Sequence, residues 1–335
     1  MRKRIRKILV TGGAGFIGSA FLGCLITENR REKDACKIVV LDKLTYAGDL
    51  RRLIRMKGYF KFIKADICNE DKVASIFKAQ EPDTIVHFAA ETHVDRSIRN
   101  VNPFIETNIK GTQVLLDVCR KINVNKFVFI STDEVYGDIR KGSFKEESAL
   151  RPNSPYAASK AAADLLAQAY MRTYDLPVII IRPSNNYGPW QYPEKLIPLA
   201  MLRLFKGERV PIYAKGMNVR EWLFVDDCAA GIYSILKRGR IGQIYNLGSG
   251  AEYRNIEVIQ LLLGILGMEG DKIEFVADRP GHDFRYSLNS SKVFKHTGWK
   301  PEVSLSNGLK TTVSWARLNK GWLTDKWEEI NKLYK

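Results

Sequence analysis

The chain has 335 residues, of which 45% are hydrophobic and 27% charged, as is ordinary for a soluble globular protein. This length leaves room for one large domain or two modest ones. The four histidines and five cysteines are scattered and contain no CxxC pair, so the sequence predicts neither a metal site nor a disulfide framework. The net charge of +16 suits a polyanionic partner, but the basic residues are widely spread. This spread favours a solvated basic surface over a nucleic-acid site.

The start of the chain predicts no cleavable signal peptide. Residues 1–7 are basic, but a glycine-rich loop follows them where a signal peptide would have an apolar region. The most apolar helical stretch, residues 256–268, is too short to span a bilayer. We therefore expect a cytoplasmic protein with reduced, mostly buried thiols and no membrane contact.

A glycine-rich loop lies between the first predicted strand, residues 7–10, and an apolar helix. Gly13, Gly15 and Gly18 have the GxGxxG spacing in this strand–loop–helix context. Glycines at such positions permit a tight turn and let a pyrophosphate approach the helix N-terminus closely. The sequence therefore predicts a dinucleotide site.

The second predicted strand, residues 37–41, ends in an acidic residue. Asp42 follows Gly18 by 24 residues and suits the ribose diol of NAD, whereas it would repel the 2′-phosphate of NADP. Lys43 points the other way, since a neighbouring cation could serve NADP. We expect NAD as the cofactor.

Further strands alternate with helices, which predicts an α/β fold with a doubly wound (Rossmann), mostly parallel sheet. These strands are expected at residues 60–63, 84–88, 126–130, 178–182 and 244–248. His87, on one of them, is interpreted as a packed core histidine. From Pro183 the pattern changes to a second, smaller mixed α/β lobe. We expect residues 1–183 plus about 219–247 to bind NAD, and residues 184–218 plus about 248–335 to bind the substrate.

Two groups of reactive side chains follow the strand at 126–130. Thr132, Asp133 and Glu134 come directly after it, where a parallel sheet opens its ligand crevice. Tyr156 and Lys160 are i and i+4 on a predicted helix. An ammonium can lower the pKa of a phenol, which would make Tyr156 a base, and the carboxyls can act as acid and base if their pKa values differ. Alone, each group is usually a surface pair or a solvated turn; a nearby nicotinamide site strengthens the catalytic interpretation.

Together these motifs resemble the extended short-chain dehydrogenase/reductases, and within them the dTDP-glucose 4,6-dehydratases. The resemblance covers nearly the whole chain. Its motifs lie at residues 11–18, 41–48, 93–97, 131–137, 156–160, 184–189, 194–198 and 279–283. The glycine loop and the Tyr–Lys pair are shared by the whole superfamily. Thr132-Asp133-Glu134 is the discriminating part, because sugar-nucleotide 4-epimerases lack this acid–base pair.

The resemblance implies a lyase reaction with a tightly held NAD that is reduced and reoxidised in one turnover. Tyr156, assisted by Lys160 and Thr132, would take the proton of the glucose 4-hydroxyl as hydride leaves C4. Glu134 would then remove the C5 hydrogen and Asp133 would protonate the departing 6-hydroxyl. Hydride would return to C6 and give a 4-keto-6-deoxy sugar.

The resemblance also implies contact residues. Positions matching cofactor contacts are Gly12, Gly15, Phe16, Ile17, Gly18, Asp42, Lys43, Leu44, Thr45, Asp66, Ile67, Phe88, Ala89, Ala90, Glu91, Thr92, Thr107, Tyr156, Lys160 and Asn186. Positions matching substrate contacts are Thr92, Thr132, Asn185, Lys195, Leu196, Pro211, Ile212, Tyr213, Arg220, Asn255, Asp278, Arg279, Pro280, Gly281 and His282. An arginine at 220 or 279 suits a diphosphate, and Tyr213 offers a ring near the nucleobase. Thr92 stands where the family typically has serine.

A homodimer is also implied, built across a two-fold axis from the helices around 108–120 and 156–174. These helices are rich in apolar residues, which include Leu115, Leu116, Leu165, Leu166 and Tyr170. The expected dimer interface is therefore a four-helix bundle to which each protomer contributes two helices.

Three alternatives stay open at this stage. The first is a related enzyme on another sugar nucleotide: a UDP-glucose 4,6-dehydratase, whose base pocket could look nearly identical in sequence, or another nucleotide-sugar epimerase. A decarboxylase of UDP-glucuronate would need a cation for the sugar carboxylate, beside which Asp133 would be badly placed. A non-catalytic NAD-binding regulator that holds RNA on its basic surface is disfavoured, because all the catalytic residue types are present.

Overall fold

The computed structural model describes residues 4–32 and 35–334. Its centre is a seven-stranded sheet in the order β10-β6-β5-β4-β1-β2-β3, with every neighbouring pair parallel. The strands are β1 (Lys7–Thr11), β2 (Lys37–Asp42), β3 (Lys61–Lys64), β4 (Thr84–His87), β5 (Lys126–Ile130), β6 (Val178–Pro183) and β10 (Ile244–Leu247). The strand order reverses between β1 and β4, where a doubly wound sheet opens its crevice. The predicted fold class is confirmed.

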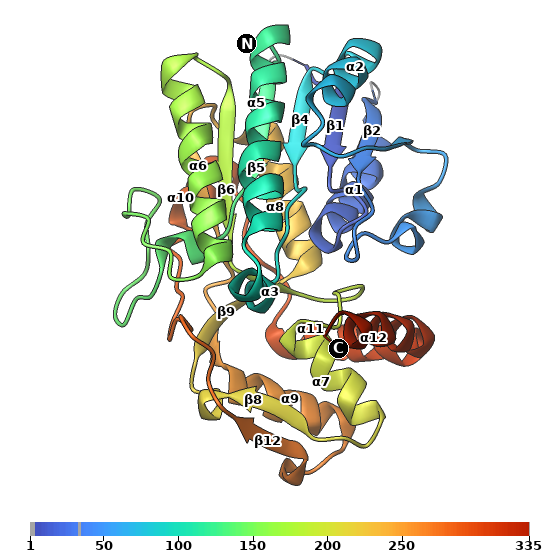
Figure 1. Cartoon of the computed structure of the whole chain (residues 1–335), viewed down its shortest axis with the longest axis vertical. Coiled ribbons are helices and arrows are strands. Elements are labelled where there is room, and N and C mark those ends of the chain that lie inside the picture. The colour runs from blue at the N-terminus through green and yellow to red at the C-terminus, as the bar shows by residue number, and fades with distance from the viewer. Residues whose placement is uncertain (1–3, 33–34, 335) are drawn as a thin grey trace.

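Helices cover both faces of this sheet (Figure 1). One face packs on α1 (Phe16–Asn29), α8 (Val225–Arg238) and α10 (Ser291–Thr297). The other face packs on α2 (Glu70–Gln80), α5 (Gly111–Ile122) and α6 (Pro155–Thr173). Strand residues alternate between the two cores, as Ile8 and Leu9 do in β1. Both faces of the sheet are thus buried, which explains why the sequences of these strands are continuous apolar runs.

The segment before α5 departs from the expected continuous helix. The chain forms α3 (Val94–Arg99), the single turn α4 (Asn102–Phe104) and a π-helical turn, Ile105–Lys110, before α5 begins. Asn108 in the π turn is buried and binds both the amide and the carbonyl of Glu91, at 2.8 and 3.0 Å. The π turn therefore brings a polar side chain to the loop that follows β4.

The second lobe has two small sheets. The first has the order β11-β9-β7, with β7 (Asn185–Tyr187), β9 (Val219–Phe224) and β11 (Glu252–Arg254). The second pairs β8 (Val210–Tyr213) with β12 (Ile273–Val276) in parallel. Around them lie α7 (Leu196–Phe205), α9 (Asn255–Leu266), α11 (Leu305–Leu318) and α12 (Lys320–Tyr334) (Figure 1). The chain returns to the large sheet through α8, β10 and α10, so the two lobes are interleaved.

Candidate active site

A cavity of about 280 Å³ opens at the carboxyl ends of the central strands. All five predicted catalytic residues line it, and so does every predicted cofactor residue except Leu44. The main chain of Leu44 has a φ of 58°, and its amide donates to the carboxylate of Asp42 at 2.8 Å. Within the described part of the chain, no group of three or more His, Cys, Asp or Glu residues could hold a metal ion.

The glycine loop between β1 and α1 forms one end of the cavity. Gly12 has a φ of +70°, and a Cβ there would lie 2.5 Å from the amide nitrogen of Ala89. A Cβ on Gly18 would collide with the carbonyl of Gly12. Gly13 does not line the cavity; a Cβ there would lie 2.6 Å from a methyl group of Val40. The glycines of this loop that line the cavity are Gly12, Gly15 and Gly18, which are the three that the resemblance gave as cofactor contacts; Gly13, the first glycine of the GxGxxG spacing, is not among them.

Asp42 lies buried at the end of β2, beside the glycine loop. Its two carboxylate oxygens accept hydrogen bonds from the amides of Ala14, at 2.9 Å, and Leu44, at 2.8 Å. Lys43 forms an ion pair with Asp66 at 2.5 Å. Because that pairing already satisfies the ammonium, Lys43 is less suited to a 2′-phosphate than its sequence position suggested. The arrangement favours NAD.

The acid–base turn follows β5 as a 3-10 helix, Asp133–Tyr136, capped by Thr132. Asp133 is 2% exposed, and burial, followed by the charges of Glu134 and Glu221, raises its pKa well above the usual range. Burial also raises the pKa of Glu134, but three cations oppose this: Lys195, Arg279 and Arg220. Both carboxyls therefore have raised pKa values, and nearby cations offset the rise more at Glu134 than at Asp133, which suits Asp133 as the acid and Glu134 as the base.

Tyr156 and Lys160 lie in the first turns of α6, where Ser154 caps the helix by accepting from the amide of Ala157 at 3.1 Å. The ammonium of Lys160 donates to the carbonyl of Ile130 at 2.7 Å, and burial lowers its pKa to about 7. Burial, followed by the charge of Glu134, raises the pKa of Tyr156. The predicted lowering of the phenol pKa was therefore wrong, because desolvation and the carboxyls of Glu134 and Asp133 outweigh the hydrogen bond with Thr132, the one contribution that lowers it.

The matched family confirms the resemblance seen in the sequence. Residues 9–312 match the model of the family described as GDP-mannose 4,6 dehydratase. The chain belongs to this family.

Among similar proteins, a dTDP-glucose 4,6-dehydratase of Streptomyces niveus is 46% identical over 97% of this chain and 95% of its own. The solved structure of DesIV, a dTDP-glucose 4,6-dehydratase from Streptomyces venezuelae with NAD bound, superposes with a TM-score of 0.91 at 48% identity, covering 94% of this chain and 98% of that one. A UDP-glucose 4-epimerase of Thermus thermophilus with NAD superposes with a TM-score of 0.85 at 31% identity, covering 93% and 99%. The resemblance is therefore stronger to dehydratases than to this epimerase.

The predicted substrate residues of this family protein fall into two groups. Thr92, Thr132, Asn185 and Lys195 line the cavity. The others lie outside its wall, in or beside the second lobe; they are Leu196, Pro211, Ile212, Tyr213, Arg220, Asn255, Asp278, Arg279, Pro280, Gly281 and His282. The charges of Arg220 and Arg279 act on Glu134, so these two members of the second group lie near the acid–base turn.

The tyrosine and the basic loop predicted for the nucleobase and diphosphate lie together. The rings of Tyr213 and His282 meet edge to face at 6.1 Å, and Nδ1 of His282 is 2.6 Å from a carboxylate oxygen of Asp278. Arg279 forms an ion pair with Asp95 at 2.9 Å. An aromatic ring and a cation thus share one surface, which suits a nucleoside diphosphate.

Several polar residues of the cavity wall were missed in the sequence. Glu194 accepts from the hydroxyl of Tyr46 at 3.1 Å, and burial raises its pKa to about 6. Gln191 and Tyr192 each have a buried polar atom without a hydrogen-bond partner among the described residues. Glu194 directly precedes the predicted Lys195, and Gln191 and Tyr192 lie four and three positions before it; this closeness in sequence could have indicated all three. Arg52 also lines the cavity, and no motif pointed to it.

His87 on β4 is buried between two threonines. Thr112 donates to the carbonyl of Asn108 at 2.6 Å, so its oxygen accepts from Nε2 of His87 at 3.0 Å. Nδ1 of His87 then accepts from the hydroxyl of Thr11 at 2.7 Å. This geometry requires a neutral ring, and burial, followed by the charge of Lys160, lowers its pKa to about 3. The interpretation of a packed core histidine is confirmed.

The His87→Gln variant is expected to lose less stability in acid than the wild type. Unfolded histidine titrates near pH 6.5, whereas folded His87 stays neutral to about pH 3. Between these values the unfolded state binds more protons, so stability falls as the pH falls. This group alone removes about 2 kcal/mol from the free energy of unfolding between pH 7.5 and 5. Urea unfolding at both pH values measures it, and an equal loss in the two proteins would contradict the prediction.

Proposed function

We propose that the chain is an NAD-dependent dTDP-glucose 4,6-dehydratase, a hydro-lyase that forms dTDP-4-keto-6-deoxyglucose. The observation that carries this function is the meeting of the Thr132-Asp133-Glu134 turn with Tyr156 and Lys160 in one cavity beside the glycine loop. The family relationship and the relatives named above support the same activity.

When bound, NAD supplies the hydride acceptor for C4 and the donor for C6. Residues of this chain would move the protons. Tyr156 would take the proton of the 4-hydroxyl, with Thr132 as its hydrogen-bond partner, since that bond opposes the rise of the phenol pKa. The cations around Glu134 favour its ionised form, which would remove the C5 hydrogen. Burial and the neighbouring carboxyls of Glu134 and Glu221 favour the protonated form of Asp133, which would donate its proton so that the 6-hydroxyl leaves as water.

The interleaved lobes divide the binding task in this proposal. Residues 1–183 with about 225–247 would hold NAD, and residues 184–224 with about 248–335 would hold the nucleotide sugar; the expected boundary near 219 moves because β9 pairs with β7 and β11 in the second lobe. Arg220 would bind the diphosphate together with Arg279, and Tyr213 would contact the thymine. We also place the enzyme in the cytoplasm, because all five of its cysteines are unpaired thiols. No described helix is long and apolar enough to cross a membrane.

The assay that tests this function mixes the purified protein with dTDP-glucose or with UDP-glucose and measures the 4-ketone. We expect the ketone from dTDP-glucose, and we expect the denatured protein to release NAD. Faster formation of the ketone from UDP-glucose would show that UDP-glucose, and not dTDP-glucose, is the preferred substrate. Release of mainly NADP would overturn the role of Asp42, and no ketone from either sugar would overturn the function.

Some apolar residues expected at the homodimer face are not available for it. Leu115 and Leu116 are fully buried in the core of the protomer. Leu165 of α6, by contrast, is 54% exposed, and Ile105 in the π turn, which packs against α6, is 44% exposed. We propose that the homodimer forms over the outer face of α6 and the π turn, which leave apolar side chains in solvent in one protomer.

The Leu165→Glu variant is therefore expected to be a monomer at micromolar concentration, because a buried unpaired carboxylate opposes association. Light scattering measures the mass. Leu318→Glu is the matched control, since Leu318 of α11 is 87% exposed on another helix. A wild type that is already monomeric, or a Leu165→Glu variant that stays dimeric, would contradict this interface.

A further inference from the structure

A guanidinium group is buried where the two lobes meet. Arg52 lies in the 3-10 helix Leu50–Met56 and is 6% exposed. It donates to three main-chain carbonyls: Ala14 at 2.9 Å, Ala47 at 2.6 Å and Trp190 at 2.9 and 3.2 Å. These carbonyls belong to the glycine loop, to the turn after β2 and to the loop that enters the second lobe. One side chain thus joins three separate segments of the cavity wall.

The positive charge of Arg52 is buried at a cost in free energy that its hydrogen bonds offset. Burial lowers the pKa of Arg52 to about 10, and the charges of Asp49 and Asp42 oppose that fall. No carboxylate among the described residues forms a hydrogen bond with Arg52. A buried cation whose hydrogen bonds go only to carbonyls is expensive unless all of those bonds stay made. Separation of the three segments would leave the guanidinium unsatisfied.

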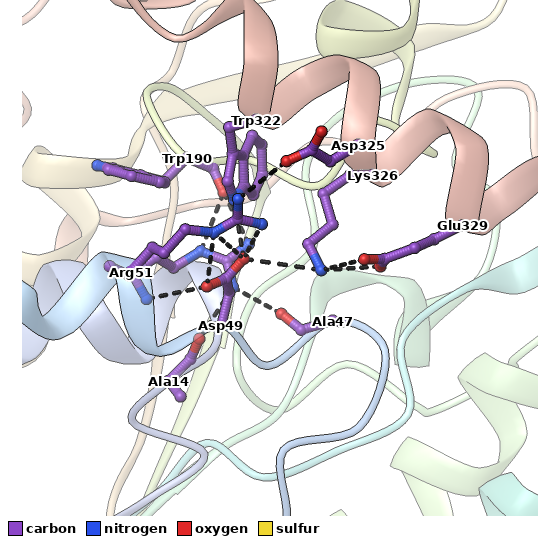
Figure 2. A network of polar contacts seen from close by, with 10 residues as sticks. Ala14, Ala47, Asp49, Arg51, Trp190, Trp322, Asp325, Lys326 and Glu329 are labelled. Carbon is purple, nitrogen blue, oxygen red and sulfur yellow. Dashed lines mark hydrogen bonds and ion pairs between the residues drawn. The ribbon is translucent and has the colours of Figure 1, made fainter.

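The neighbouring Asp49 ties the same helix to the C-terminal helix α12 (Figure 2). Its amide donates to the carbonyl of Ala14 at 3.0 Å. Its carboxylate accepts from the amide of Arg51 at 2.9 Å and from Nε1 of Trp322 at 2.8 Å, and it lies 3.7 Å from Nζ of Lys326. Asp49 therefore links the glycine loop, through its amide, to Trp322, which binds its carboxylate from 273 positions further along the chain.

Aromatic packing holds the second-lobe side of this junction. The rings of Trp190, Trp315 and Trp322 lie 5.0 to 5.5 Å apart, and the guanidinium of Arg52 lies 5.4 Å from the ring of Trp322. Trp190 has a φ of 69°, in the left-handed region that a bulky residue seldom adopts. Packing and the bonds to its carbonyl hold this backbone, and with it the cavity residues Gln191 and Tyr192.

We propose that Asp49, Arg52, Trp190, Trp322 and Lys326, here called the latch, keep NAD in the cavity throughout a turnover. The glycine loop and Asp42 form one wall of the cavity, and residues 183–195 form another. Arg52 binds to both walls, so the dinucleotide leaves only when these bonds break. The proposal rests on the proposed function, in which the same NAD must return its hydride. The latch residues act by positioning the walls and take no part in the chemistry.

The test measures NAD release from the holoenzyme as purified, by mixing it with an excess of an enzyme that destroys free NAD. Arg52→Met is expected to release NAD roughly 10- to 100-fold faster, because its charged hydrogen bonds to both walls are lost. Arg55→Met is the matched control, because Arg55 lies in the same 3-10 helix but is exposed. Equal release rates for Arg52→Met and the wild type would overturn the proposal.

Trp322→Phe provides a milder second variant, which keeps an aromatic ring but removes the N–H bond to Asp49 and part of the packing on Trp190 and Trp315. We expect faster NAD release and a turnover that falls as NAD is lost but returns to the wild-type rate when NAD is added. A merely structural role would not give this rescue. If Arg52→Met does not fold, Trp322→Phe decides alone, and unchanged release from it overturns the latch. NAD release is measured without sugar, so failure of the dehydratase assay would be a separate result.

Discussion

Glu134→Gln is expected to reduce its bound NAD at close to the wild-type rate and then stop, with the sugar oxidised at C4 and its 6-hydroxyl intact. Glutamine keeps the shape of the side chain but cannot accept the C5 proton. Oxidation at C4 does not need that proton, so the first hydride transfer proceeds. We expect overall turnover to fall roughly 10²- to 10⁴-fold, the usual effect of removing a positioned base.

Tyr156→Phe should behave in the opposite way. Without the phenol oxygen, the 4-hydroxyl has no proton acceptor, and reduction of NAD itself should fail. Stopped-flow absorbance of the nicotinamide after mixing with dTDP-glucose separates the two variants. Glu147→Gln is a suitable control, since Glu147 is exposed and lies outside the cavity. Turnover of Glu134→Gln near the wild-type rate, or normal NAD reduction by Tyr156→Phe, would show that the assigned role is wrong.

The fold and the position of the site were predictable because both depend on local patterns. Buried parallel strands have continuous apolar sequences, and the reactive groups come directly after them, as Asp42 does after β2 and Thr132 after β5. Alternation with helices makes the strands parallel, so their carboxyl ends meet at one edge of the sheet. Residues that act at this edge can therefore be found without knowledge of tertiary contacts.

The features that were missed depend on contacts between distant residues. The pKa of Tyr156 follows from its burial, which the spacing of Tyr156 and Lys160 does not reveal. Arg52 in the sequence is one basic residue among many, and it becomes a link only because Trp190, 138 positions later, turns its carbonyl toward it.

Asp133→Asn is expected to stall after the same first hydride transfer as Glu134→Gln, with a comparable loss of roughly 10²- to 10⁴-fold. The two variants should differ at C5. Glu134 is intact in Asp133→Asn, so the C5 hydrogen should exchange with deuterium from solvent, whereas in Glu134→Gln it should not. Mass spectrometry of the recovered sugar measures the exchange.

A substrate with fluorine in place of the 6-hydroxyl tests the acid role directly, because fluoride leaves with less help from a proton. It should restore elimination in Asp133→Asn and leave Glu134→Gln inactive.

The rate of elimination by the wild type should also depend on pH. Burial and the charges of Glu134 and Glu221 raise the pKa of Asp133, so the acid is protonated below that pKa, and wild-type elimination should fall as the pH rises through it. Asp133→Asn should lack this alkaline fall with the fluorinated substrate. If fluoride gives no rescue, or if the fall persists in the variant, another group is the acid.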